Sequence, residues 1–295
     1  MYKILIYGEI TWSVGKVHKS ISEYLKNDFE FTFYDWSKIY PIDLIPILIN
    51  YDIVLTNLVT LNIFKRYVSS LKNFIFIAHG YPDVIGYKND FNLKLEDFST
   101  ESLFAVTSNS IKCLFPKEII LKNLFNGVDL KKYDRQQSNT VIKKIGWCGA
   151  PEIISKRVDW IFEITNKSDT LLSIASTIPT DQLYQWYKNI DVLVITAGPD
   201  EWMETGPLPA FEAIATGKLV IGTKVGNFAK FPGPKFSTME EAIFLIKYLQ
   251  IHSDEVEQII KEQYKYLKEN FSYEILHLQW KEVFLECLKN NNHSI

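Results

Sequence analysis

A chain of 295 residues, of which 47% are hydrophobic and 23% charged, has the composition of a globular protein with one large domain or two of ordinary size. Its formal net charge of −3 argues against a protein that coats nucleic acid through overall basicity. The three cysteines have no spacing typical of a disulfide framework or a zinc knuckle, and no run approaches the roughly 18 apolar residues of a membrane span. We therefore expect a cytoplasmic protein.

The first part of the chain alternates between two patterns. Short apolar runs are typical of buried parallel strands, and the amphipathic segments between them are typical of helices. The predicted strands cover 3–8, 29–36, 51–58, 73–80 and 103–110, and the predicted helices cover 17–25 and 63–71. The alternation continues through 118–129. Strands that alternate with helices predict crossover units and a parallel sheet.

A second series of the same kind follows a polar joint at 126–140, which contains glycine and asparagine. The predicted strands here are 141–149, 171–176 and 191–198, the predicted helices are 155–167, 180–190 and 207–216, and an apolar segment at 218–226 precedes helical stretches from Met239 onward. The sequence thus predicts an α/β protein with two Rossmann-like, doubly wound domains that face a cleft. A C-terminal helix is expected to cross back to the first domain. The expected bounds are 1–135 and 136–275 for the domains and 276–295 for that helix.

Charge is distributed unevenly along the chain. Between Lys112 and Arg157, ten basic residues stand against four acidic ones, so this segment carries +6 and the remainder carries −9. An anionic ligand or an anionic surface is a natural partner for such a segment, although a solvated face gives the same pattern.

The run METGPLPAFEAIATG at 203–217 carries most of the functional signal. It follows the predicted strand 191–198, so it lies at the carboxyl edge of a parallel sheet, where open α/β folds bind ligands. A proline at 207 or 209 fits the first turn of a helix, and Gly217 fits the left-handed position after its end. The free N–H groups and the positive dipole end of this helix make a site for phosphate.

Two glutamates flank this helix start. Glu204 precedes it, and Glu212 lies about one turn inside it. A carboxylate accepts hydrogen bonds in pairs, and vicinal sugar hydroxyls donate them. Two carboxylates beside a helix-bound diphosphate therefore indicate a nucleotide sugar, with one glutamate on the hexose and the other on the ribose. The same spacing also arises where Glu212 only complements the helix dipole and Glu204 is an exposed loop acid.

With its continuation to residue 226, this run resembles the E-x7-E signature of GT-B glycosyltransferases, specifically the retaining enzymes of glycosyltransferase family 4. Other segments follow in the family's order, well in the second half and weakly in the first. They are VGKVHKSISEYL at 14–25, NGVDLKKY at 126–133, IGWCGAPEIISKRVD at 145–159, PTDQLYQWYKNIDVLVIT at 179–196 and FSYEILHLQW at 271–280. The sequence departs from the family at Val14, where a second glycine is common, and at Trp147 and Cys148, near which the family usually has an arginine.

The resemblance implies the transfer of a hexose-type sugar, with retention of anomeric configuration, from a UDP- or GDP-sugar substrate to a hydroxyl acceptor. Glu204 would bind hydroxyls of the donor sugar, and Glu212 would bind the ribose diol. The backbone N–H groups of Thr205, Gly206 and Leu208 would lie near the sugar and the diphosphate.

Lys156 and Arg157 would neutralise the diphosphate, because cations stabilise the charge that develops on the departing group. A solvated helix start is the other interpretation of this basic pair. Gly15 would let the N-terminal loop approach the phosphates. No HxH, DxD or HExxH cluster indicates a metal, and no cofactor is expected.

His79, at the carboxyl end of the predicted strand 73–80, matches a histidine that lies beside the donor sugar in the family. A structural loop histidine is an equally good interpretation. Asp83 is a weaker candidate, and His18 is expected to face solvent on its helix.

The acceptor is open. A glycan or glycolipid is favoured, modified DNA is an alternative, and peripheral contact with a membrane is compatible with the sequence. Three other functions compete: a GT-B-like nucleotide-sugar-binding protein without turnover, a nucleotide-sugar epimerase or phosphorylase, and a Rossmann oxidoreductase. The last is disfavoured because the loop GEITWSVG lacks GxGxxG.

Overall fold

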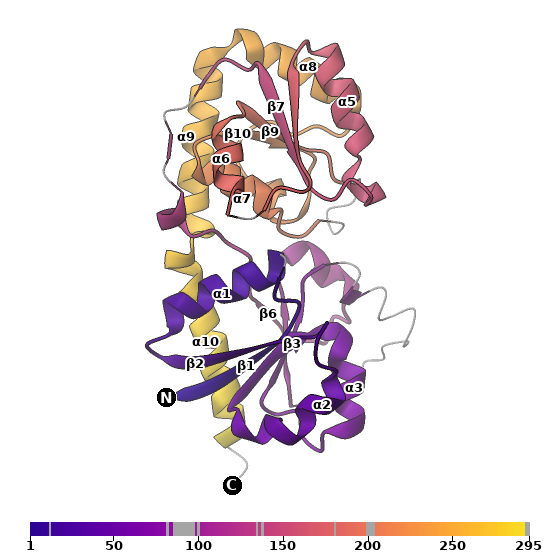
Figure 1. Ribbon diagram of the computed structural model, residues 1–295, viewed down its shortest axis with the longest axis vertical. Coiled ribbons are helices and arrows are strands. Elements are labelled where there is room, and N and C mark those ends of the chain that lie inside the picture. The colour runs from indigo at the N-terminus through magenta and orange to yellow at the C-terminus, as the bar shows by residue number, and fades with distance from the viewer. Residues whose placement is uncertain are drawn as a thin grey trace. The chain divides into compact units, whose positions relative to one another are not determined.

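The computed structural model describes residues 1–11, 13–80, 83–84, 98, 101–133, 135–136, 139–179, 181–198 and 204–292. The chain divides into two compact units (Figure 1). Unit 1 comprises Met1–Asn126 and Tyr273–Ile295, and unit 2 comprises Gly127–Ser272. Each unit contains one parallel sheet. No helix in the described ranges is long and apolar enough to cross a membrane.

The sheet of unit 1 has six strands in the order β2-β1-β3-β4-β5-β6. The strands are β1 (Tyr2–Gly8), β2 (Phe29–Asp35), β3 (Ile53–Asn57), β4 (Phe74–Ala78), β5 (Leu103–Val106) and β6 (Leu121–Asn123). Both β3 and β4 are buried along their whole length, which explains why their sequences are nearly continuous apolar runs. β2 forms an edge of the sheet and is more exposed.

Helices cover both faces of this sheet (Figure 1). On one face α1 (Ser13–Leu25) packs against α10 (Tyr273–Asn292), and on the other lie α2 (Pro41–Leu44) and α3 (Leu61–Tyr67). The described residues of this unit also form the 3-10 turns η1 (Ile45–Asn50), η2 (Leu58–Thr60) and η4 (Asn109–Leu114). The expected return of the C-terminal helix to the first half is confirmed. The Phe284 ring of α10 lies 5.5 Å from that of Phe29, and Lys281 Nζ donates to Asp28 Oδ1 at 2.6 Å.

The sheet of unit 2 has four strands in the order β10-β9-β7-β8. They are β7 (Lys144–Cys148), β8 (Leu171–Ala175), β9 (Val192–Ile195) and β10 (Leu219–Gly222). Along this sheet α5 (Val158–Lys167) packs with α8 (Met239–Ile251), and α7 (Leu208–Ala215) packs with α6 (Leu183–Lys188) and α9 (Ser253–Asn270). The short turns are η5 (Leu130–Lys132), η6 (Ile154–Lys156) and η7 (Gly226–Lys230).

The core of unit 2 lies between the sheet and the α5/α8 pair. It contains the inward side chains of β7, β9 and β10 together with Ile161, Ile164 and Ile246, all of them at most 2% exposed. The β10 edge is closed by Gln263 of α9. Its side-chain amide accepts from Val220 N at 3.1 Å and donates to Val220 O at 2.6 Å. The amide therefore pairs two backbone groups on the buried outer edge of β10 that no neighbouring strand could pair.

Several helix starts differ from the sequence prediction. The first helix begins at Ser13, four residues before the expected start at 17. The helix expected over 155–167 begins at Val158, because η6 and a left-handed Arg157 precede it. The helix expected over 180–190 begins at Leu183, and Thr180, whose side chain the sequence predicts as its N-cap, lies outside the described residues. Gly217 follows α7 with φ of 85°, as predicted for a left-handed position after a helix.

Candidate functional site

Unit 2 gathers polar side chains where its parallel strands end. Two loops meet there, one after β7 and one after β9. Thr196 joins them, because its hydroxyl donates to Lys156 O at 2.6 Å and accepts from Trp147 Nε1 at 3.0 Å. A second link runs from Gly198 N to Ser155 O at 2.6 Å. These bonds fix the backbone that carries Lys156.

Lys156 and Glu204 form an ion pair at this edge of the sheet. Nζ of Lys156 donates to Oε2 of Glu204, and the two side chains are 27% and 18% exposed. Both residues line a narrow pocket together with Cys148, Pro207 and Pro209. The pocket has a cavity volume of about 20 Å³, which is room for about one water molecule. Little empty space therefore remains beside the ion pair and the two prolines.

The backbone of Glu204 and Thr205 rests on a tight turn at Gly226. Gly226 has φ of 44°, and a Cβ added to it would lie 2.1 Å from Thr205 O and 2.2 Å from Glu204 O. Asn227 N donates to Thr205 O at 2.8 Å. A side chain at position 226 would therefore push the Glu204 segment away. Sequence reasoning did not select Gly226, because this approach joins segments that are distant along the chain.

The helix α7 begins with few backbone donors. Its first helical hydrogen bond runs from Ala210 N to Pro207 O at 2.9 Å, and prolines at 207 and 209 have no N–H. The N–H groups of Gly206 and Leu208 precede that bond, in a buried stretch that follows Thr205. The first turn of α7 has no acidic side chain of its own against the positive end of the helix dipole.

Glu212 is buried inside α7, with 3% of its surface exposed. The hydroxyl of Tyr187 donates to Glu212 Oε2 at 2.9 Å. Burial raises the pKa of Tyr187 well above its ordinary value, and the charges of Glu212 and Cys148 raise it further. Cys148 also lines the pocket beside Glu204, so it is close both to Glu204 and to Tyr187, the hydrogen-bond partner of Glu212. Sequence reasoning did not single out Tyr187.

Arg157 has an unusual backbone and a different partner from Lys156. Its φ and ψ of 48° and 53° are left-handed, a conformation that costs a non-glycine residue about 1 to 2 kcal/mol. Its guanidinium carbon lies 4.4 Å from the ring centroid of Trp160, so the charge stacks on an aromatic face. The structure therefore separates the two basic residues of the predicted clamp, with Lys156 on Glu204 and Arg157 on Trp160.

His79, Gly15 and Asp83 belong to unit 1. His79 follows β4, and its backbone N–H donates to Asp83 Oδ2 at 2.6 Å. Burial lowers the pKa of His79 well below its ordinary value, and neighbouring His18 lowers it further. Gly15 lies in the first turn of α1, where an added Cβ would lie 2.3 Å from the backbone carbonyl carbon of Ile10. Close packing against Ile10 within unit 1 thus explains a glycine at position 15. The roles of His79 and Gly15 in binding a donor stay predictions.

The expectation that His18 faces solvent is wrong. Its side chain is 4% exposed and packs edge-on against the rings of His79 and Trp280, at centroid distances of 5.4 and 5.7 Å. Burial lowers the pKa of His18 to about 4. The signal was available in the sequence, because His18 shares a helical face with the buried Ile21 and Leu25.

Within the described part of the chain, no group of three or more histidine, cysteine, aspartate or glutamate side chains is placed to hold a metal ion. Among the described residues that line the pocket beside Glu204, Lys156 carries a positive charge.

Solved structures align with nearly the whole chain, although their sequence identity to it is low. The chain aligns with Anabaena HepE in complex with UDP and glucose at a TM-score of 0.74 and 12% identity, covering 97% of this chain and 100% of that one. It aligns with an alpha-glucosyltransferase in complex with UDP and a 13-mer DNA containing a HMU base at 0.66 and 12%, covering 96% and 99%. The chain has the GT-B fold.

A third match at that fold is AviGT4, a glycosyltransferase involved in avilamycin A biosynthesis, with a TM-score of 0.58, 10% identity and 98% of each chain covered. No protein-family model matches the sequence, and no curated protein matches it. The GT-B fold agrees with the predicted arrangement of two doubly wound α/β halves and a C-terminal helix on the first.

Proposed function

We propose that this protein is a retaining glycosyltransferase that moves a hexose-type sugar from a nucleoside diphosphate sugar, UDP- or GDP-linked, to a hydroxyl acceptor. The single observation that carries the proposal is the Lys156–Glu204 ion pair at the start of α7. It places one cation and one carboxylate beside a helix dipole, which is the combination that a sugar diphosphate needs. Support also comes from the solved GT-B structures that contain UDP, glucose or UDP-glucose.

Donor binding would exchange the partners of this ion pair. The diphosphate takes the Lys156 ammonium and the N–H groups of Gly206 and Leu208, and hydroxyls of the sugar donate to the Glu204 carboxylate. The ribose hydroxyls donate to Glu212. Each charged group of the protein thus gains a ligand partner in place of the one it loses, which limits the cost of separating the ion pair.

In the transfer step, the bond between the anomeric carbon and the diphosphate oxygen breaks, and its electron pair leaves with the nucleoside diphosphate. The acceptor oxygen forms the new bond on the same face of the sugar, and its proton passes to a departing phosphate oxygen. Negative charge grows on the diphosphate in this step. Lys156 and the dipole of α7 stabilise that charge without having to reorient.

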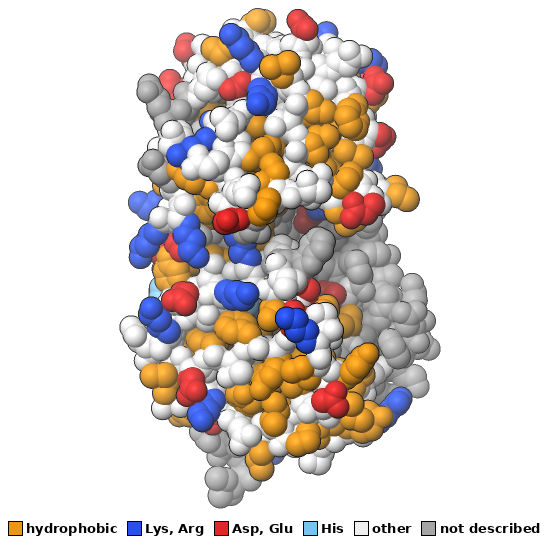
Figure 2. Space-filling model, in the orientation of Figure 1, with side chains coloured by type: hydrophobic (Ala, Val, Ile, Leu, Met, Phe, Trp, Pro, Cys, Tyr) orange, Lys and Arg blue, Asp and Glu red, His pale blue; other side chains and the backbone are white. Residues whose placement is uncertain are grey.

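For the acceptor we propose a glycan or glycolipid hydroxyl. Hydrophobic side chains gather on the face of unit 1 over β1, β2 and α2 (Figure 2). Tyr40 and Ile42, next to and within α2, are 74% and 49% exposed. An exposed apolar surface of this kind suits a lipid-linked acceptor at a membrane surface.

The test of the proposed function is turnover. Purified protein is incubated with UDP-glucose, and separately with other UDP-, GDP- and ADP-sugars, while release of the nucleoside diphosphate is measured with and without glycan, glycolipid or hydroxymethylated DNA acceptors. We expect acceptor-stimulated release from at least one donor, and an α-linked product from an α-linked donor by NMR. A donor that raises the melting temperature without any release would indicate a binding protein. Interconversion of the donor sugar would indicate an epimerase.

A further inference from the structure

Tyr187 makes a buried contact that the donor roles described above do not use. It lies on α6 with none of its surface exposed, and its hydroxyl donates to Glu212 Oε2 at 2.9 Å. Glu212 is itself 3% exposed. A buried carboxylate needs hydrogen-bond donors, and tyrosine supplies one from a ring with only two side-chain torsions. The contact therefore restricts how the Glu212 carboxylate is oriented.

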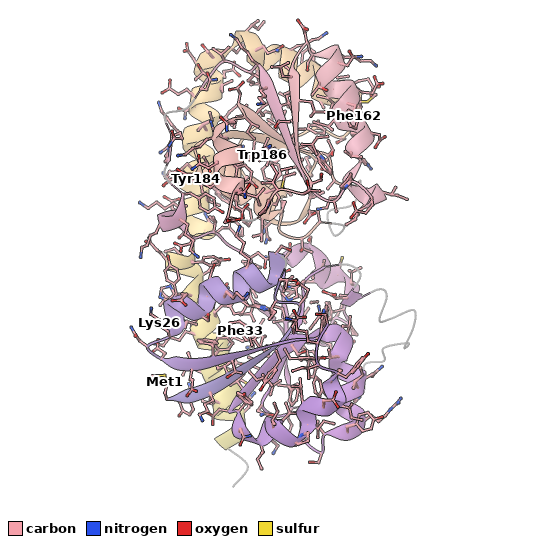
Figure 3. The ribbon with its side chains drawn as sticks, viewed as in Figure 1. Met1, Lys26, Phe33, Phe162, Tyr184 and Trp186 are labelled. Carbon is pink, nitrogen blue, oxygen red and sulfur yellow. The ribbon has the colours of Figure 1, made fainter. Side chains whose placement is uncertain are left out.

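The position of Tyr187 is in turn held by the elements around α6. Trp186, labelled in Figure 3, donates from Nε1 to Ser173 Oγ of β8 at 2.9 Å, and its ring lies 5.1 Å from that of Tyr187. Lys188, the last residue of α6, accepts a hydrogen bond at its carbonyl oxygen from Lys218 Nζ at 3.0 Å. Lys218 lies three residues beyond the end of α7, so the segment after α7 is also tied to the C-terminal end of α6. The Tyr187 hydroxyl is thus presented to Glu212 from a fixed place.

The protonation state of Tyr187 determines that its hydroxyl is the donor in this hydrogen bond. Burial and the Glu212 charge both raise the pKa of Tyr187. The phenol therefore stays protonated at neutral pH and acts as the donor. A carboxylate has about four lone-pair sites, and the Tyr187 phenol occupies one of those of Glu212.

We propose that Tyr187 is a positioning residue for nucleotide recognition, whose hydroxyl holds the Glu212 carboxylate in the orientation that accepts the ribose hydroxyls of the donor. This inference rests on the proposed function, in which Glu212 binds the ribose. It assigns to α6, which contributes no residue to the pocket beside Glu204, a part in selecting ribonucleotides. The competing interpretation is that the hydrogen bond only ties α6 to α7.

The two interpretations predict different affinities of the variant Tyr187→Phe for nucleotides with and without ribose hydroxyls. Phenylalanine keeps the ring and removes only the hydroxyl. UDP and 2′,3′-dideoxy-UDP are titrated into the wild type and the variant by calorimetry, with GDP and its dideoxy form used if the wild type prefers guanine. We expect the variant to bind UDP about 10-fold to 100-fold more weakly, the range for losing a hydrogen bond to a charged group. Dideoxy-UDP, which lacks the hydroxyls that Glu212 would accept, should bind the variant and the wild type alike.

A matched control is Tyr248→Phe, which removes a tyrosine hydroxyl that donates to Glu255 at 2.6 Å on the exposed side of the same unit. It should leave both affinities at wild-type values. In turnover, Tyr187→Phe should raise KM for the donor and leave kcat nearly unchanged, because the ribose contact is the same in the ground state and the transition state. Adding Tyr187→Phe to Glu212→Gln should cause little further loss of UDP affinity.

Equal weakening of UDP and dideoxy-UDP, or no weakening of either, would overturn the role of Tyr187 while leaving the proposed function in place. If the wild type binds none of UDP, GDP and ADP, the proposed function fails, and the inference fails with it. Circular dichroism and the melting temperature of each variant show that the titrations compare folded proteins.

Discussion

The ammonium of Lys156 donates a hydrogen bond to the carboxylate of Glu204, although the two residues are 48 positions apart in the sequence. The backbone of Lys156 is held by Thr196 after β9. After β10, Gly226 lies against the backbone of Glu204 and Thr205, and Asn227 N donates to Thr205 O. The loops after three strands of one sheet therefore converge on a single ion pair. In the proposed function, the ammonium of this pair would bind the diphosphate of the donor, and the carboxylate would bind its sugar.

Replacing Lys156 with alanine tests the cationic half of the pair. The variant loses the charge that would stabilise the departing diphosphate, and removing one such group typically lowers kcat by about 100-fold to 1,000-fold. We expect kcat/KM for the donor to fall by at least that factor. Steady-state release of the nucleoside diphosphate measures it. The matched control is Lys167→Ala, which removes a half-exposed lysine paired with Glu163 at 3.4 Å in the same unit and should keep wild-type rates.

Replacing Gly226 with alanine tests the support under Glu204. The new Cβ would meet Thr205 O and Glu204 O, and its backbone would have to hold φ of 44°. We expect a loss of about 2 kcal/mol or more in the free energy of unfolding, or a shift of the Glu204 segment that lowers donor binding. Urea unfolding and donor titration measure the two effects. Gly8→Ala is the control, since nothing lies within 4 Å of its added Cβ; if both variants behave alike, the close contact at Gly226 has no consequence.

The buried His18 predicts a loss of stability in mild acid. Its pKa is about 4 in the folded protein and about 6.5 in the unfolded chain, so the unfolded chain binds the proton more readily. The folded state is therefore most favoured above pH 6.5 and loses about 3 kcal/mol as the pH falls from 6.5 to 4. His79, the titratable ring that faces His18, has a pKa lowered in the same direction and adds to the loss.

The measurement is the free energy of unfolding in urea between pH 7.5 and pH 4.5. His18→Gln keeps a polar side chain of similar size and removes the titration, so its curve should fall less steeply than that of the wild type. Identical slopes for the wild type and His18→Gln would show that burial of His18 does not govern the acid sensitivity.

Much of the site's local structure was predictable from proline and glycine residues that mark helix ends. Pro207 and Gly217 mark the ends of α7 by backbone rules that act within a few residues, and the structure places the helix between them. The alternation of apolar runs and amphipathic segments likewise indicated the two parallel sheets. The apolar positions of the C-terminal helix were consistent with packing on either half.

What could not be predicted depends on contacts between distant segments. The pairing of Lys156 with Glu204, the stacking of Arg157 on Trp160 and the approach of Gly226 to Thr205 have no local signature. Spacing alone did not distinguish a phosphate clamp from a solvated helix start. The tertiary structure does distinguish the two basic residues, because it gives each of them a different partner.

The proposed function requires that Glu204 bind the sugar of a nucleotide-sugar donor beside Lys156. Its most direct test is calorimetric titration of UDP and UDP-glucose, or of GDP and a GDP-hexose if the wild type prefers guanine, into the wild type and Glu204→Gln. The control is Glu257→Gln, whose carboxylate pairs with Lys261 at 2.6 Å on an exposed face of α9. We expect Glu204→Gln to bind UDP at least as tightly as the wild type, since no carboxylate then competes for Lys156, and to bind UDP-glucose at least 10-fold more weakly. Wild-type affinity of Glu204→Gln for UDP-glucose, or no binding of either ligand to the wild type, would contradict it.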